Sequence, residues 1–165
     1  MKLEEFEIAY SGLSGVSAVA AELGKKVGTH VLARGLCGSS RALLLASVFA
    51  RTGKHLLVVV EDAEEAGYLK SDIEKLVNGA EETNGANGKK VFLFPATHRI
   101  RQKGQDESYT IQRTEVLTRL EGKEPCVVVT FPDALNEEVV TQEMFRTRSI
   151  EVQVGQEISE QQLAE

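Results

Sequence analysis

The chain has 165 residues, of which 42% are hydrophobic and 27% are charged, and its formal net charge is −6 at pH 7. This length suits one α/β domain with its own core, and the acidic balance argues against a dedicated nucleic-acid binder, which usually presents a basic surface. No run approaches the roughly 20 apolar residues of a membrane span, and the acidic start "MKLEEFEIAY" lacks the core of a signal peptide. We therefore expect a cytoplasmic protein that contacts no membrane.

The first third of the chain predicts two helices around one strand. An Ala-rich stretch at 14–28 predicts a short helix, and "HVLARGL" at 30–36 predicts a strand that ends in a glycine-containing turn. Ser39 or Ser40 is expected to cap the next helix, "RALLLASVFARTG", which ends at Gly53. This helix is apolar almost all round, so we expect it to be well buried.

The clearest strand is "HLLVVVED" at 55–62, whose continuous apolar run is typical of a parallel strand covered on both faces. Asp62 and Glu65 then have the spacing of a capping box, which predicts a helix that begins at Asp62. The apolar residues expected on its inward face are Ala66, Leu69, Ile73 and Leu76.

The rest of the chain continues the alternation. Strands are predicted at 91–95 and 126–130, with a helix from about 109 to 120 between them and another near Pro132. The inward residues of the longer helix are expected to be Val116, Leu117 and Leu120. A half-exposed strand is predicted at 149–154, followed by the start of a helix. This order predicts an α/β fold with a parallel sheet and flanking helices.

One turn resembles a phosphate-binding loop with altered residues. "GLCGSSRALL" at 35–44 lies where a predicted strand meets a helix, the context of the pattern G-x-x-x-x-G-K-[ST]. Gly35 fits the first glycine, but Ser40, Arg41 and Ala42 replace the second glycine, the lysine and the hydroxyl residue.

The replacements remove chemistry that phosphoryl transfer requires. Ala42 has no hydroxyl for Mg²⁺, the planar guanidinium of Arg41 is not equivalent to a lysine ammonium, and Ser40 has a side chain where the backbone must approach phosphate. We therefore predict no catalytic residue and only a degenerate loop, a candidate anion site at a helix N-terminus. Its residues are Gly35, Gly38, Ser39, Ser40, Arg41 and Ala42.

The acidic, histidine and cysteine residues that could bind a metal are better explained by structural roles. Glu61 and Asp62 stand at a strand end where a metal site is an alternative, but a helix cap explains them better. The three histidines show no spacing typical of metal ligands, and Cys37 and Cys126 read as reduced, small, buried residues. We therefore predict no metal site.

Four segments occur in a characteristic order: "GLCGSSRALLLASVFARTGKHLLVVVEDAEEAGYLKSDIEKL", "FLFPATHR", "QRTEVLTRL" and "CVVVTFPDALNEEVV". Together they resemble the N-terminal region of bacterial transcription-repair coupling factors. That region is similar to the first domain of the excision-repair helicase UvrB, which has a P-loop NTPase fold, but its nucleotide-binding motifs have decayed. The resemblance covers nearly the whole chain and implies a UvrB-like α/β domain over 1–148. Residues 149–165 would be the truncated start of an inserted domain that contacts UvrA.

The resemblance also implies a function for the parent protein, an ATP-dependent DNA translocase that displaces stalled RNA polymerase and recruits UvrA for nucleotide excision repair. ATP and Mg²⁺ would act in motor domains outside this fragment, and the polymerase and DNA would be bound by other domains. The fragment itself would be a scaffold without a cofactor. Two alternatives remain: a P-loop enzyme with an atypical loop, and a helicase-like DNA-binding module that uses Arg99, Arg101 and Lys103.

Overall fold

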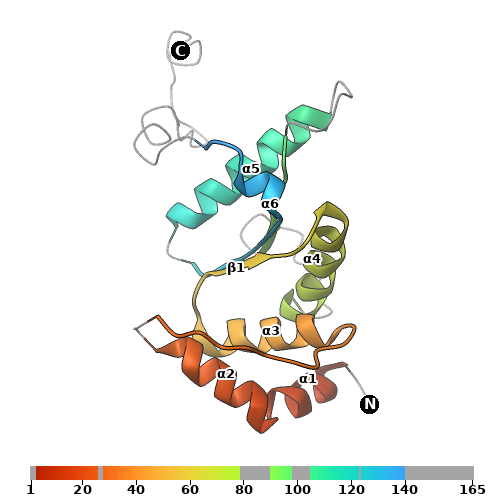
Figure 1. The fold of residues 1–165 in the computed structure, drawn as a ribbon, viewed down its shortest axis with the longest axis vertical. Helices are drawn as coiled ribbons and strands as arrows, with labels where there is room; N and C mark the ends of the chain where they lie inside the picture. The colour runs from red at the N-terminus through yellow and green to blue at the C-terminus, as the bar shows by residue number, and fades with distance from the viewer. Residues whose placement is uncertain (1–2, 26–27, 79–89, 98–104, 123, 140–165) are drawn as a thin grey trace, which may run out of the picture.

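The structure is a computed structural model that describes residues 3–25, 28–78, 90–97, 105–122 and 124–139. A three-stranded sheet with helices α4, α5 and α6 forms one part of the molecule, and helices α1, α2 and α3 form the other (Figure 1). In chain order the elements are α1 (Leu3–Ser11), α2 (Ser14–Gly24), α3 (Ser40–Thr52), β1 (Leu56–Val59), α4 (Ala63–Asn78), β2 (Val91–Leu93), α5 (Gln105–Glu121), β3 (Val127–Thr130) and α6 (Pro132–Leu135).

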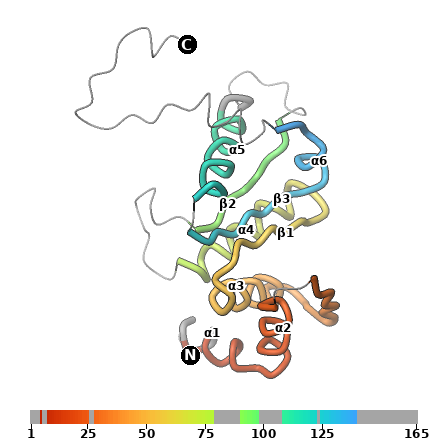
Figure 2. Tube along the Cα trace, turned by 90° about the vertical axis from the view of Figure 1, so that its left-hand side faces the viewer, coloured from red at the N-terminus to blue at the C-terminus, as the bar shows by residue number. Residues whose placement is uncertain are grey.

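The sheet is entirely parallel, with the strand order β1-β3-β2 (Figure 2). Val127 of β3 is the register partner of both Leu56 in β1 and Val91 in β2. The predicted α/β class with a parallel sheet and flanking helices is therefore confirmed. The chain moves from β1 past β3 to β2 through α4 and returns to β3 through α5. Since such crossovers are right-handed, these two helices lie on opposite faces of the sheet.

The core is centred on β3, whose four residues are all buried because this strand lies between the other two. Helix α4 packs on β2 and β3, and α5 packs on β2. The predicted inward face of α4 is largely confirmed: Ala66, Leu69 and Ile73 are buried, and Leu76 is half-buried. Helix α3 packs between α4 on one side and α1 and α2 on the other, so it joins the two parts of the molecule.

The predicted strand at 30–36 is wrong. These residues form neither strand nor helix, and Leu32 remains 75% exposed. In Figure 1 the segment passes over α3 rather than beside the sheet. A strand needs a neighbour to satisfy its backbone groups, and among the described residues β1 pairs only with β3. The glycine turn therefore follows an extended segment and does not follow a strand.

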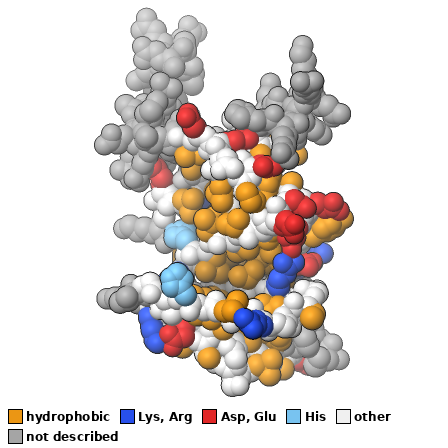
Figure 3. All heavy atoms as spheres, viewed as in Figure 1, with side chains coloured by type: hydrophobic (Ala, Val, Ile, Leu, Met, Phe, Trp, Pro, Cys, Tyr) orange, Lys and Arg blue, Asp and Glu red, His pale blue; other side chains and the backbone are white. Residues whose placement is uncertain are grey.

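The expectation that β1 is covered on both faces is also wrong. Leu56 and Val58 pack against the core, but the side chains of Leu57 and Val59 are 63% and 50% exposed. Helix α5 packs on β2, which lies at the opposite edge of the sheet from β1. The space-filling view accordingly shows a large group of hydrophobic side chains around the position of β1 (Figure 3).

The predicted end of α3 is confirmed, but its predicted serine cap and the predicted burial of one cysteine are wrong. Gly53 ends α3 in the left-handed conformation, as predicted, with φ of 57°. Neither Ser39 nor Ser40 caps α3: Ser39 makes no side-chain capping bond, and the Ser40 hydroxyl donates to the Cys37 carbonyl instead. Cys37 is exposed, which corrects its predicted burial, whereas Cys126 is buried as expected.

Helix α5 differs from its prediction in one residue of its inward face, and helix α1 has no counterpart among the predicted elements. In α5, Val116 is buried and Leu117 is half-buried, but Leu120 is 44% exposed and does not face the core. The predicted elements from 149 onward, and the boundary at 148, lie outside the described residues. No described helix has the length and apolar character that crossing a bilayer requires.

Candidate functional site

The glycine turn is closed by its own hydrogen bonds. Gly35 and Gly38 adopt positive φ values of 78° and 53°, a conformation that L side chains rarely adopt. The Ser40 backbone N–H donates to the Cys37 carbonyl over 3.1 Å, and the Ser40 hydroxyl donates to the same oxygen over 2.7 Å. The turn that precedes α3 is therefore held without a ligand.

The end of the turn is anchored to the rest of the molecule. The Tyr10 hydroxyl donates to the Ser40 carbonyl over 3.2 Å, which ties α1 to the start of α3. Ala42 has no exposed surface and belongs to the core cluster. Its side chain therefore points inward, so the position that would provide a metal-binding hydroxyl in an active loop contributes to packing here.

Arg41, the cation of the turn, is paired with an acid of α4. Its Nη2 lies 2.5 Å from Glu65 Oε1, while Glu65 Oε2 accepts the Glu61 backbone N–H over 3.0 Å. The Glu61 N–H and then Arg41 hold the pKa of the Glu65 carboxyl below its usual value of 4.5. Much of the attraction that Arg41 would offer to a phosphate is therefore already directed to a carboxylate.

A depression of about 360 Å³ lies beside this ion pair. Its lining residues are Gly38, Arg41, Asp62, Glu64, Glu65, Tyr68, Leu69 and Asp72. The lining therefore contains four carboxylates and one guanidinium. The local charge is negative, so a triphosphate entering here would be repelled, although the N-terminus of a helix favours anions.

The structure separates the residues predicted to form the anion site. Gly38 and Arg41 line the depression, whereas Ala42 is buried behind it. Asp62 caps α4, because its Oδ1 accepts the Glu65 N–H over 2.9 Å, so the helix-cap interpretation of Asp62 is confirmed. The acidic lining of the depression, formed by Asp62, Glu64, Glu65 and Asp72, was not predicted. Its signal was the spacing of Glu65, Tyr68 and Asp72 at steps of three and four, which places them on one helix face.

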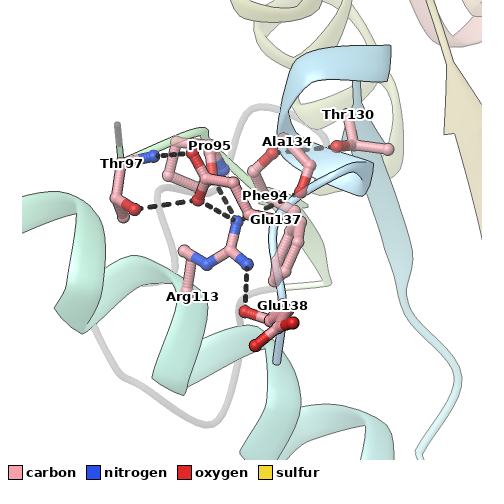
Figure 4. A network of polar contacts seen from close by, with 8 residues as sticks. All are labelled: Phe94, Pro95, Thr97, Arg113, Thr130, Ala134, Glu137 and Glu138. Carbon is pink, nitrogen blue, oxygen red and sulfur yellow. Dashed lines mark hydrogen bonds and ion pairs between the residues drawn. The ribbon is translucent and has the colours of Figure 1, made fainter. Parts of the chain in front are cut away.

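A second polar cluster, which we call the Arg113 clasp, joins α5 to the carboxyl ends of β2 and β3 (Figure 4). The Arg113 Nη1 donates to the Pro95 and Ala134 carbonyls, over 2.8 and 3.3 Å, and lies 3.1 Å from Glu137 Oε2. Glu137 in turn accepts the backbone N–H and the hydroxyl of Thr97, over 2.7 and 2.8 Å.

Both charges of the clasp are almost fully buried, with 9% of the Arg113 side chain and 8% of the Glu137 side chain exposed. Burial lowers the pKa of Arg113, and Glu137 opposes that shift. The guanidinium also lies 4.1 Å from the Phe94 ring centroid, a cation–π contact. A guanidinium surrounded in this way binds parts of its own chain, so we assign it a structural role.

The sequence carried a signal for the clasp. Arg113 precedes Val116, Leu117 and Leu120 by three, four and seven residues, so it lies on the stripe expected to face inward. Thr130 is also buried, and its hydroxyl donates to the Phe94 carbonyl over 2.9 Å. A threonine at this strand end therefore stabilises the sheet next to the clasp.

One cysteine–histidine pair lies at the start of the sheet. Cys126 Sγ is 3.3 Å from His55 Nδ1, and the Cys126 backbone N–H donates to the same nitrogen over 3.3 Å. Burial raises the pKa of the Cys126 thiol, and the charge of Arg119 opposes that shift. A nucleophilic cysteine needs the opposite shift, toward the thiolate, so this pair lacks the character of a catalytic dyad.

Among the described residues, no three side chains of the metal-binding types come together. Arg99, Arg101 and Lys103, the residues of the DNA-binding alternative, lie outside the described residues. Comparison with protein-family models, with curated proteins and with solved structures finds no match to this chain.

Proposed function

We propose that this chain is a non-catalytic scaffold domain of the kind found at the N-terminus of transcription-repair coupling factors, with a UvrB-like α/β fold and a decayed phosphate loop. Its parent would be the ATP-dependent DNA translocase that displaces stalled RNA polymerase and recruits UvrA. The domain would hold neighbouring parts of that protein in place, in the cytoplasm, and would use no cofactor of its own.

The single observation that carries the non-catalytic part is the Arg41–Glu65 ion pair at the mouth of the acidic depression. A working phosphate loop needs a free cation and a metal-binding hydroxyl at this point. Here the cation is paired with a carboxylate and the hydroxyl position is a buried alanine. The ordered sequence resemblance supports the coupling-factor part of the proposal.

Calorimetric titration of the chain with ATP and excess Mg²⁺ tests the non-catalytic part. We expect no measurable heat of binding, because four carboxylates line the depression beside the turn and would repel a triphosphate. A steady-state phosphate-release assay should likewise show the same background for the wild type and for Arg41→Ala. Micromolar binding, or turnover that Arg41→Ala abolishes, would favour the alternative of a P-loop enzyme with an atypical loop.

The coupling-factor assignment needs a separate test, because a scaffold could belong to another protein. The gene that encodes this chain should continue into a reading frame that contains helicase motifs. A gene whose frame lacks such motifs would refute the assignment to a translocase while leaving the non-catalytic role intact.

A further inference from the structure

The sheet has an open edge along β1. Leu56 and Val60 direct their backbone groups toward β3, since their N–H groups donate to the Cys126 and Thr130 carbonyls over 2.9 and 3.0 Å. Backbone groups alternate along a strand, so those of Leu57 and Val59 point to the other edge. The part of the chain that the structure describes places no strand there. Such an edge is a template for another strand.

The same stretch also exposes apolar surface. Leu57 and Val59 keep 63% and 50% of their surface exposed on one face of β1. Figure 3 shows that the hydrophobic side chains gathered there face outward and form a continuous area. An open backbone edge combined with an apolar face is typical of a surface that binds an added strand.

The sequence of this edge is complementary to itself. "KHLLVVVED" begins with the basic or polar residues Lys54 and His55 and ends with the acids Glu61 and Asp62. In an antiparallel pair centred on Val58, every basic end would lie opposite an acidic end. A parallel pair would instead place like residues beside one another. Charge complementarity therefore favours antiparallel pairing of two identical strands.

The register centred on Val58 also satisfies the backbone geometry. It places Leu57 opposite Val59 of the second copy, and these are the residues whose backbone groups point outward. Directly opposed residues of this kind exchange two hydrogen bonds. On the exposed face, Leu57 packs beside that Val59, and His55 lies opposite Glu61 of the second copy. Since His55 Nδ1 accepts the Cys126 N–H, Nε2 is the ring nitrogen that is left to donate to a carboxylate.

We propose that β1 is a homodimer interface, in which two copies of this chain pair antiparallel through their β1 edges about a two-fold axis at Val58. The two three-stranded sheets become one continuous sheet. The interface is isologous, so each contact occurs twice and each substitution acts twice.

Analytical ultracentrifugation of the 165-residue chain over a range of concentrations tests this proposal. The wild type should show a reversible monomer–dimer equilibrium. Val59→Lys, which places a charge against Leu57 of the second copy, should raise the dissociation constant at least about tenfold. Glu61→Lys should also raise the dissociation constant, because in this register it removes the carboxylate that lies opposite His55 of the second copy. Ile111→Lys is the matched control. Ile111 is 68% exposed on α5, and its substitution should leave the dissociation constant of the dimer unchanged.

The register has its own test. Leu57→Asp and Val59→Lys chains should each be mainly monomeric, but a mixture of the two should form a heterodimer, since the new Asp and Lys lie opposite one another. A wild type that stays monomeric would overturn the proposal and would indicate that another part of the chain or another protein covers the edge. A dimer that resists Val59→Lys and Glu61→Lys would also overturn it, because the interface would then lie elsewhere. A mixture that remains monomeric would refute the register.

Discussion

Removing Arg113 should destabilise the protein more than any other single charge deletion among the described ion pairs. Arg113→Met keeps a side chain of similar length but leaves Glu137 buried without its cation, and it leaves the Pro95 and Ala134 carbonyls without this donor. Breaking a buried pair by removing one partner costs about 3 to 5 kcal/mol. The loss should be at this level, because both side chains are less than a tenth exposed.

Urea unfolding followed by circular dichroism measures this loss. Lys70→Met is the control, since the Lys70–Glu74 pair on α4 is partly exposed and should contribute no more than about 0.5 kcal/mol. The double variant Arg113→Met/Glu137→Met removes both charges, so its cost should fall short of the sum of the single costs by about 1 kcal/mol or more. Additive single costs, or an Arg113→Met loss no larger than that of Lys70→Met, would refute the reasoning.

Three further predictions concern other parts of the structure. The lowered pKa of Glu65 means that its ionised form stabilises the fold above the usual value of 4.5, and that this stability is lost as the pH falls through the lower folded-state value. The melting temperature of Glu65→Gln should therefore lie below that of the wild type at neutral pH and approach it in acid; a difference that grows in acid would contradict the pairing with Arg41. Cys37 should react with a thiol reagent in the native protein and Cys126 only after unfolding, which counting the labelled thiols with and without urea would show. Ile73→Ala should cost about 2 to 5 kcal/mol in urea unfolding, because Ile73 is fully buried under the sheet; a cost below about 1 kcal/mol would mean that α4 packs differently.

Local patterns predicted the elements whose signal lies within their own residues. The apolar run of β1, the helical spacing of Ala66, Leu69 and Ile73 and the terminal Gly53 were sufficient because each reflects one face, one period or one backbone conformation. The segment at 30–36 depends on tertiary structure instead. Val31, Leu32 and Leu36 suit a strand, but a strand forms only where another offers its backbone groups, and that depends on tertiary structure.

The site was predicted less well than the fold, for a similar reason. The sequence showed that Arg41 stands where a lysine is needed, but not that Glu65, 24 residues later, would pair with it. The Arg113 clasp joins three segments that are brought together only by the two crossovers. Interactions of this kind are set by topology, so they become visible only once the strand order is known.

The turn before α3 is expected to hold no nucleotide. Two-dimensional NMR of the ¹⁵N-labelled chain tests this expectation at the turn itself, through the amides of Gly35, Gly38 and Ser40 during titration with ATP and Mg²⁺. We predict that these resonances do not move beyond the small changes caused by inorganic phosphate. Saturable shifts confined to these amides, dependent on Mg²⁺ and lost in Arg41→Ala, would contradict the account.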